Sequence, residues 1–214
     1  LNFEKLTEYA KGAINVVNSI FDVFVSLIVS VYLLAERRKI LEFFKRLTSA
    51  LFKKDKYKLI AKYFNKSNEV FFSFISGQVL DAIVVGILTS IAMSVIGVKY
   101  SVLLGFLIGL FNLIPYFGAI IAVTVAILIT IFTGGIGQAI VMAIVVIILQ
   151  QIDANIINPK IIGGSLSISP LLVIFSVTVG GAYFGVLGMF LAVPIFTVIK
   201  LLIEEYIEYK SSTI

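Results

Sequence analysis

The residues best suited to do chemistry lie in a polar segment between two long apolar runs. Residues 100–152 and 161–199 contain no charged side chain, and Asp153, Asn155 and Asn158 lie between them. A carboxylate beside amide groups can bind a cation or hydrogen-bond a polar solute. Irregular backbone at membrane depth is tolerated only against protein or along a watery cavity. We therefore predict that residues 150–170 break the helical pattern and line a binding site.

Other polar residues in apolar surroundings extend this predicted site. A charge at the centre of a bilayer costs about 2.5–3.5 kcal/mol on insertion scales, so such residues usually face a cavity, a partner or a pathway. Asp153 is the first candidate, with a helix cap at the membrane surface as its alternative and Lys160 as its ion-pair partner or an interfacial anchor. The predicted substrate- or ion-binding residues are Asp153, Asn155, Asn158, Gln150, Asn112, Asp81 and Gln78.

Prolines and glycines predict where the helices break and where they pack closely. Proline removes a helical hydrogen bond, and small residues at four-residue spacing let two helices approach. The predicted hinges or helix breaks are Pro115, Gly118, Pro159, Gly163, Gly164, Pro170 and Pro194. The predicted packing positions are Gly86, Gly105, Gly109, Gly181, Gly185 and Gly188.

The composition indicates an integral membrane protein. The 214 residues are 60% hydrophobic and 14% charged, with a mean hydropathy of +1.10, whereas soluble domains have about 25% charged residues. Apolar blocks reach the roughly 20 residues that a membrane helix needs, and the alternating pattern of a β-barrel is absent. We predict an all-α, polytopic membrane protein with several short, broken or re-entrant helices.

Enzymatic chemistry has little support in the sequence. With no cysteine and no histidine, catalysis by a serine or cysteine with a histidine base is excluded, as are thiolate and imidazole metal sites. A phosphate-binding glycine loop is absent. Asp22 and Asp81 do not lie in the glycine-flanked motif of an intramembrane aspartyl protease. We predict no enzyme, no cofactor and no resident metal.

The charge distribution predicts the orientation of the chain. Of its 17 Lys and Arg residues, 11 lie in residues 37–66 with only four acidic residues in 36–69. A nucleic-acid surface is one interpretation, but basic residues beside a span are typical of a cytoplasmic loop. We predict an exposed end at 1–12 and a first span at 13–35. A basic amphipathic cytoplasmic region is predicted to follow at 36–69, where it lies either at the headgroups or on the helical bundle. The remaining chain is predicted to form a membrane transport region at 70–203 and a tail at 204–214.

Three features inside the transport region leave the path of the chain open. Residues 101–133 could form a re-entrant hairpin, two short spans or one kinked helix, with a break at 112–118. Residues 134–137 are predicted to be a loop, and residues 180–203 to be the last span.

Five motifs occur together in consistent order along the chain: Gly77-Gln78, NLIPYFG at 112–118, DANIINPKIIG at 153–163, Ser169-Pro170 and GVLGMFLAVP at 185–194. In these the sequence resembles the autoinducer-2 exporter family of permeases. The resemblance implies about eight membrane helices, an inner-face helical region after the third, and homo-oligomers, with pentamers as the expected form. Against that pattern the first two spans are absent, so residues 13–35 correspond to the third. Asp153 stands where the family usually carries glutamate.

These observations predict a secondary transporter in a bacterial or archaeal cytoplasmic membrane. By resemblance it exports a small polar solute such as autoinducer-2, by alternating access around residues 150–170. The alternative is a Na⁺(Li⁺)/H⁺ antiporter that uses Asp153 and Asp81. An alternative of another class is a non-transporting oligomeric scaffold, in which Asp153→Asn would leave every flux unchanged. The expected partners are the lipid bilayer, the solute or Na⁺ and H⁺, and further copies of the chain, without nucleic acid.

Overall fold

The fold is known from a computed structural model that describes residues 17, 21–22, 24–162 and 168–211. The described residues form helices and no strand, which confirms the predicted all-α class. The chain divides into two compact units, Leu1–Ala61 and Lys62–Ile214. After an apolar helix, Phe24–Ala35, the elements are α2 (Arg37–Leu51), α3 (Lys54–Val95), α4 (Ser101–Phe111), α5 (Phe117–Ile152), the π-helical turn η1 (Asp153–Ile157), α6 (Asn158–Ile162) and α7 (Pro170–Ser211).

From residue 24 onward, the first unit contains two helices and the start of a third. Helix α2 ends where Phe52 adopts an extended conformation, with φ −118° and ψ 144°. Helix α3 begins two residues later and continues without interruption from the basic region into the apolar sequence. The basic region predicted at 36–69 is therefore not one structural element, because its helices break at residues 52–53 and not at its end.

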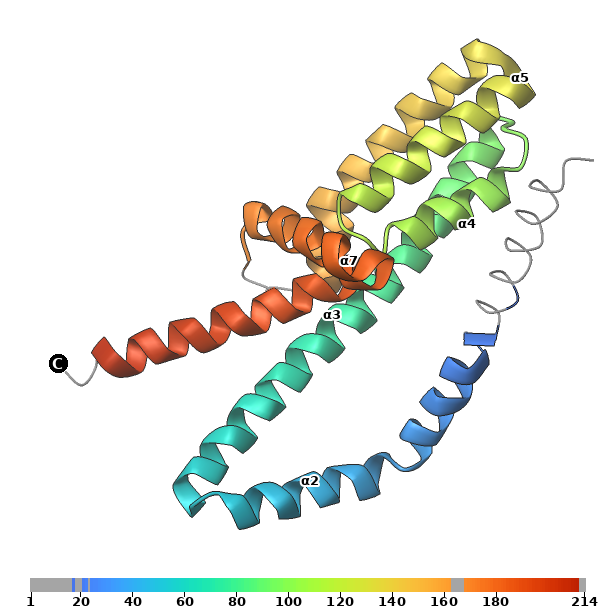
Figure 1. The fold of residues 1–214 in the computed structure, drawn as a ribbon. Helices are drawn as coiled ribbons and strands as arrows, with labels where there is room; N and C mark the ends of the chain where they lie inside the picture. Colours follow the sequence, from blue (N-terminus) through green and yellow to red (C-terminus); the bar gives the residue numbers. More distant parts are fainter. Residues whose placement is uncertain (1–16, 18–20, 23, 163–167, 212–214) are drawn as a thin grey trace, which may run out of the picture. The chain divides into compact units, whose positions relative to one another are not determined.

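The second unit contains a bundle in which α4 and both arms of α5 run beside the C-terminal part of α3 (Figure 1). Its buried core takes residues from all of these elements: Val85, Met93, Val98, Leu104, Ile108, Ala122, Ala126, Met142 and Val146. A smaller cluster joins α3 and the α4–α5 connection to the two arms of α7 through Phe74, Ile114, Val177 and Val193.

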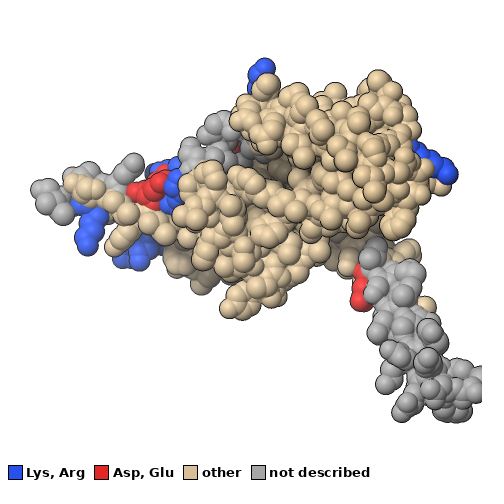
Figure 2. All heavy atoms as spheres, turned by 90° about the horizontal axis from the view of Figure 1, so that it is seen from above, with Lys and Arg blue, Asp and Glu red and all other residues tan. Residues whose placement is uncertain are grey.

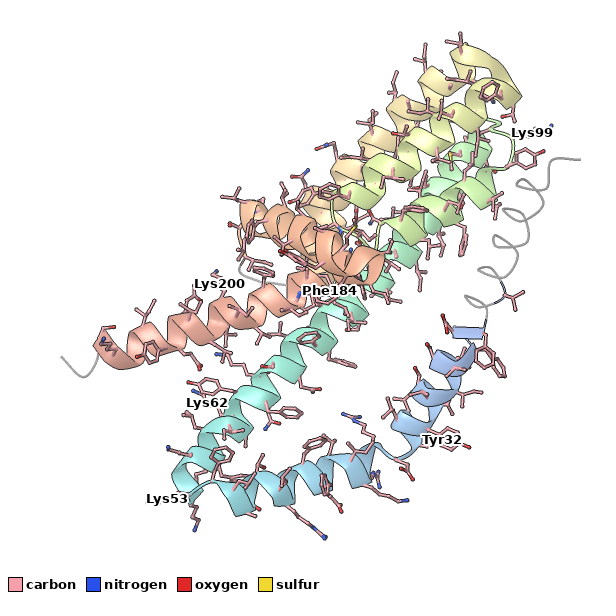
Figure 3. All side chains as sticks on the ribbon, in the orientation of Figure 1. Tyr32, Lys53, Lys62, Lys99, Phe184 and Lys200 are labelled. Carbon is pink, nitrogen blue, oxygen red and sulfur yellow. The ribbon has the colours of Figure 1, made fainter. Side chains whose placement is uncertain are left out.

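The turn between α3 and α4 is closed by its own backbone. Gly97 has a φ of +71°, its N–H donates to Ser94 O at 3.0 Å, and the Val98 N–H donates to Met93 O at 2.9 Å. This is the Schellman arrangement that ends many helices at glycine. Gln138 of α5 donates to Gly97 O at 2.8 Å, which ties the turn to the tip of the bundle. Lys99 marks this turn in Figure 3.

The connection at residues 112–116 separates α4 from α5, so residues 101–133 form two short helices. Pro115 has no N–H to donate, and Tyr116 adopts a φ of +65° that residues other than glycine rarely adopt. Gly118 is required for close packing, because a Cβ there would come within 1.6 Å of Phe111 O. Gly118 therefore lies in the first turn of α5 and is not itself the break.

Two long helices fold back on themselves at single glycines. Gly135 in α5 has φ +83° and ψ +171°, and Gly185 in α7 has φ +61° and ψ −146°. The predicted loop at 134–137 is therefore a one-residue reversal. The predicted last span at 180–203 is wrong, because it includes the reversal at Gly185. Phe184 marks this tip in Figure 3.

The predicted breaks at Pro159 and Pro194 are wrong, whereas Pro170 does lie at a break, after the non-helical residues 168–169. Pro159 lies inside α6, and Pro194 is fully buried inside α7. Pro170 begins α7, where a missing N–H costs no helical bond, and Ser169 Oγ accepts a hydrogen bond from the Leu172 N–H at 3.4 Å. The π-helical turn immediately before Pro159 moves the carbonyl that its ring would otherwise meet. Gly163 and Gly164 lie outside the described residues.

Five of the six predicted glycine packing positions lie at close contacts, and the sixth lies at a turn. A Cβ on Gly109 would meet Ala82 O at 2.4 Å, one on Gly105 would meet Ser90 N at 2.6 Å, and Gly86 faces both glycines. Gly188 lies against Gly180 O, and Gly181 lies against the Met189 side chain. Gly185 makes no such contact, because its role is the reversal described above.

Three described helices are long and apolar enough to cross a membrane: Lys56–Val95, Phe117–Ile161 and Pro170–Ile207. The surface view shows broad areas without charged residues, as expected of helices that face lipid (Figure 2). The reversals at Gly135 and Gly185 mean that two of the three helices are hairpins, which agrees with the predicted broken or re-entrant helices.

Candidate functional site

The two aspartates of the predicted site come together through one asparagine. Asp81 lies in the middle of α3, Asn112 follows the last residue of α4, and Asp153 begins η1. Asn112 Nδ2 donates to Asp81 Oδ2 at 2.9 Å and to Asp153 Oδ2 at 3.3 Å. The two carboxylate oxygens therefore lie within about 6 Å of each other, where like charges repel strongly in a low-dielectric interior.

Two more amides support this arrangement. Asn158 Nδ2 of α6 approaches Asp81 Oδ2 at 3.4 Å. Gln78, one helical turn before Asp81, donates from Nε2 to the main-chain oxygen of Asn112 at 2.7 Å. That oxygen is one of the carbonyls that the end of α4 leaves without a helical partner. Gln78 thus fixes the connection that carries Asn112.

Both carboxylates are buried and incompletely satisfied. Asp81 is 0% exposed and Asp153 is 5% exposed. The second oxygen of each, Asp81 Oδ1 and Asp153 Oδ1, has no hydrogen-bond partner among the described residues. Unpaired buried charge is costly, and a buried carboxylate normally gains a proton, a cation or several donors. The site can therefore hold a proton or a monovalent cation between the two aspartates.

The π-helical turn that begins at Asp153 sets the direction of Asn158, which follows it and also reaches Asp81. Each turn of a π-helix contains an extra residue, so the side chains after it are rotated relative to those of the preceding α-helix. The sequence signal was present as polar residues before Pro159, but it was interpreted as a break in the helix. The structure shows that the helix widens and continues into α6.

A cavity of about 590 Å³ opens beside the aspartates. Gln150 lines it, and the Gln150 Nε2 atom is buried without a hydrogen-bond partner among the described residues. Asp153 also lines the cavity, and its Oδ1 atom is likewise buried without a partner among the described residues. Its other walls come from α3, the α4–α5 connection, α5, α6 and α7, and include Phe74, Gln78, Asn112, Pro115, Tyr116, Ala119, Gln151, Asn158, Pro159 and Val193.

Two residues of the predicted site lie elsewhere. Asn155 is exposed, and its Nδ2 donates to Gln151 O one turn earlier at 2.7 Å, so it does not join the aspartates. Its amide compensates a carbonyl within the widened turn. Lys160 is exposed and forms no ion pair with Asp153 in the described structure. The structure therefore brings together Gln78, Asp81, Asn112, Asp153 and Asn158, with Gln150 on the cavity wall.

One cavity residue was missed from the sequence. Tyr116 lines the cavity and is half exposed, and its positive φ places it in a strained part of backbone space. Strained residues cluster at functional sites. Its position directly after Pro115 was the available signal, because proline often occupies the second position of a turn and the next residue then takes the third.

No group of three or more Asp, Glu, His or Cys residues able to hold a metal ion occurs among the described residues. A calcium or magnesium cage of several carboxylates therefore has no basis in this part of the chain.

Comparison with known proteins points to one family. The family model described as AI-2E family transporter matches residues 1–208. The chain is 30% identical over 201 residues to YrrI of Bacillus subtilis, which is provisionally named a transport protein, and this match covers 94% of the chain and 57% of YrrI. It is 30% identical over 149 residues to PerM of Escherichia coli strain K12, provisionally named a permease, covering 69% of the chain and 42% of PerM.

A third relative, YueF of Bacillus subtilis, is also provisionally named a transport protein. It is 33% identical over 139 residues, which cover 65% of the chain and 37% of YueF. The chain thus spans about half the length of the curated relatives that it matches.

Proposed function

This chain belongs to the AI-2E transporter family, and we propose that it forms part of a secondary transporter whose coupling site is the Asp81–Asp153 pair. The observation that carries the proposal is the Asn112 amide, which donates to both carboxylates at 2.9 and 3.3 Å. One donor cannot neutralise two buried charges. A proton or a cation has to enter with the pair, and its arrival and departure change the charge of the site by one unit.

The coupling ion acts on elements that can respond to it. Asp81 lies on a long helix, Asn112 on the connection after α4, and Asp153 on a π-helical turn. An ion that binds one arrangement of these elements better than another shifts the balance between the two arrangements. Alternating access then follows if one arrangement opens the cavity to the opposite side of the membrane.

The cavity suits a small polar solute. Gln150 Nε2 lacks an acceptor, and Asp153 Oδ1 lacks a donor. A hydroxyl group supplies both functions, because it donates one hydrogen bond and accepts others. We therefore propose a small, neutral, hydroxyl-bearing solute, with autoinducer-2 moved outward across the cytoplasmic membrane as the specific case that the family resemblance suggests.

The second candidate is sodium–proton exchange without an organic solute. The unpartnered Asp81 Oδ1 and Asp153 Oδ1 atoms favour it, since carboxylate oxygens can bind Na⁺ directly and release it when protonated. In this mechanism the cavity is the aqueous access path. The oligomeric state stays a prediction under either function.

The test uses proteoliposomes that contain the wild-type protein, Asp81→Asn, Asp153→Asn or the control Asn155→Ala. Asn155 is the matched control because it is a polar neighbour of Asp153 that lies outside the cluster. Two readouts are measured: proton movement after a sodium pulse, and autoinducer-2 movement under an imposed pH gradient. We expect both aspartate variants to lose at least tenfold in the coupled flux, and Asn155→Ala to retain it.

The pattern of losses separates the candidates. Sodium-driven proton movement without solute, lost in both aspartate variants, supports the antiporter. Autoinducer-2 movement that needs the pH gradient and both aspartates supports the exporter. If the wild type moves protons or autoinducer-2 and both aspartate variants keep that flux, the pair is not the coupling site. If the wild type moves neither, a structural role for the protein becomes the better hypothesis.

A further inference from the structure

Helix α2 exposes an apolar face that none of the described residues of its own unit covers. Ile40, Phe44, Leu47 and Leu51 recur at helical spacing along one side. Phe44 is 55% exposed and Leu51 is 68% exposed, and α2 contains no buried residue. An amphipathic helix with an uncovered apolar side needs a partner that removes this side from water.

Rows of basic residues border the apolar face. Lys39 and Arg46, seven residues apart, follow one edge, and Arg38 and Lys45 follow the other. Lys39 pairs only with Glu36, at 3.3 Å and on the exposed surface. Among the described residues, Arg38, Lys45 and Arg46 form no ion pair. The partner of α2 must therefore be apolar in the middle and negative along both edges.

We propose that α2 lies in the headgroup layer of a membrane that contains anionic lipid. Its apolar side enters the boundary with the acyl chains, and Lys39, Arg46, Arg38 and Lys45 contact lipid phosphates. Long basic side chains reach from an apolar surface to the headgroups, and anionic leaflets attract basic segments next to spans. This inference is independent of the transport function proposed above.

The charge pattern favours lipid over protein as the partner. A second copy or another part of this chain would have to offer acidic side chains to both basic rows. Glu205 is already paired with Lys66 at 2.8 Å and with Lys62 at 3.4 Å, and Glu204 is paired with Lys200 at 3.5 Å. Asp81 and Asp153 are buried. Asp22, Glu42 and Glu69 are exposed, but they are single acidic residues on three different helices and form no row. Anionic headgroups supply negative charge along both edges of α2.

The neighbouring sequence brings α2 to a membrane in any case. The apolar helix Phe24–Ala35 immediately precedes it, and the candidate span Lys56–Val95 begins a few residues after it. A helix tethered between two such segments is held near the bilayer surface, so its own affinity for lipid only needs to set its depth and rotation. Figure 3 shows the α2 side chains between the labelled Tyr32 and Lys53.

The absence of cysteine from these 214 residues makes a direct test simple. A nitroxide spin label is attached at Phe44→Cys on the apolar side, or at Ser49→Cys on the opposite side as the matched control. The full chain is reconstituted in vesicles of phosphatidylcholine with phosphatidylglycerol, or of phosphatidylcholine alone. The measurement is the collision rate of each label with oxygen, which concentrates in lipid, and with a water-soluble nickel chelate.

We expect the ratio of oxygen to nickel collisions to be several-fold higher at position 44 than at position 49 in the anionic vesicles. Adding Lys45→Gln and Arg46→Gln to the Phe44→Cys protein should lower this ratio at least twofold, whereas Lys99→Gln, at the α3–α4 turn, should not change it. The ratio at position 44 should also fall in vesicles of phosphatidylcholine alone and in high salt.

Three results would overturn the proposal. A label at position 44 that is shielded from both oxygen and nickel would place α2 against protein, and dilution with unlabelled chain would tell whether that protein is a second copy. Equal ratios at positions 44 and 49 would mean that α2 has no fixed orientation at a membrane. A ratio that ignores phosphatidylglycerol and the charge variants would mean that the basic rows do not bind anionic lipid.

Discussion

The α3–α4 pair contains two contacts of opposite character within a few residues of each other. At the glycine crossing, formed by Gly86, Gly105 and Gly109, the backbones touch and leave no room for a single methyl group. At the carboxylate site, formed by Asp81, Asn112 and Asp153, buried polar atoms lack partners and a cavity opens. One contact is complete as it stands, whereas the other becomes complete only with a proton, an ion or a solute.

The difference suggests that the two contacts along the same pair of helices have separate roles. Gly109 and Asn112 are three residues apart and face the same side of α3, where Ala82 follows Asp81 directly. The crossing therefore fixes how far Asn112 stands from Asp81. The closely packed glycine crossing holds the two helices at a fixed distance. The carboxylate site next to it, whose buried polar atoms lack partners, can bind a ligand. Substitutions at the glycine crossing or at the carboxylate site should therefore have different effects on stability and on flux.

The largest effect on stability is expected at the crossing. In Gly109→Ala the new Cβ would lie 2.4 Å from Ala82 O and 2.8 Å from Gly86 Cα. Both are backbone atoms, so the helices must separate. We expect a loss of about 3 kcal/mol in the free energy of unfolding, at the upper end of overpacking costs. Denaturant unfolding followed by circular dichroism in detergent micelles measures it.

Gly137→Ala is the matched control for that substitution. Gly137 is a helical residue of α5, and a Cβ there meets nothing within 4 Å. Replacing glycine by alanine in an open helix position should stabilise it by about 0.5–1 kcal/mol. The two changes are chemically identical and opposite in expected sign. Equal effects would show that the crossing is looser than its geometry indicates.

The second prediction concerns Asn112→Leu, which keeps the branched shape of the side chain, at a larger volume, and removes the shared donor. Both carboxylates then lose a hydrogen bond in a buried site, and the expected destabilisation is about 2 kcal/mol. Coupled flux should fall at least tenfold. The same micelle unfolding and the proteoliposome assay measure the two effects.

A second substitution distinguishes lost charge compensation from lost packing. Adding Asp81→Asn to Asn112→Leu removes one of the two charges, so it should restore part of the stability and none of the flux. Asn155→Leu, at the exposed neighbour, should change neither quantity. A double variant as unstable as the sum of its single variants would mean that Asn112 acts on the fold alone.

Much of this arrangement could be predicted from the sequence, because it follows from residue type and spacing. Asp81, Asn112, Asp153 and Asn158 stand out as polar groups among apolar neighbours, and burial of polar groups without function is costly. The break at 112–116 followed from the proline there. The glycine contacts of Gly86, Gly105 and Gly109 followed from their spacing.

The remaining features depend on three-dimensional context that a single sequence does not carry. Pro159 predicts a break by its chemistry, yet a π-helical turn precedes it and the helix continues into α6. Gly185 looks like a packing glycine by spacing, yet its backbone angles reverse the chain. Asn155 is as polar as Asn158 but lies on the other side of the turn. Local composition does not determine which of these alternatives the tertiary contacts select.

The smallest effect is expected from Gln78→Leu. Gln78 is 2% exposed, and its amide holds the Asn112 carbonyl at 2.7 Å. Its loss should cost about 1 kcal/mol, the usual net value of one hydrogen bond, and let the connection that carries Asn112 move. Gln138→Leu is the comparison, because it also removes an amide that caps a helix end, at Gly97 O, but in a partly exposed place. There water can replace the amide, so stability should change less. The coupled flux of each variant is compared per amount of folded protein. A lower flux in Gln78→Leu than in Gln138→Leu would mean that Gln78 positions the carboxylate site. Equal fluxes would mean that Gln78 serves the fold alone.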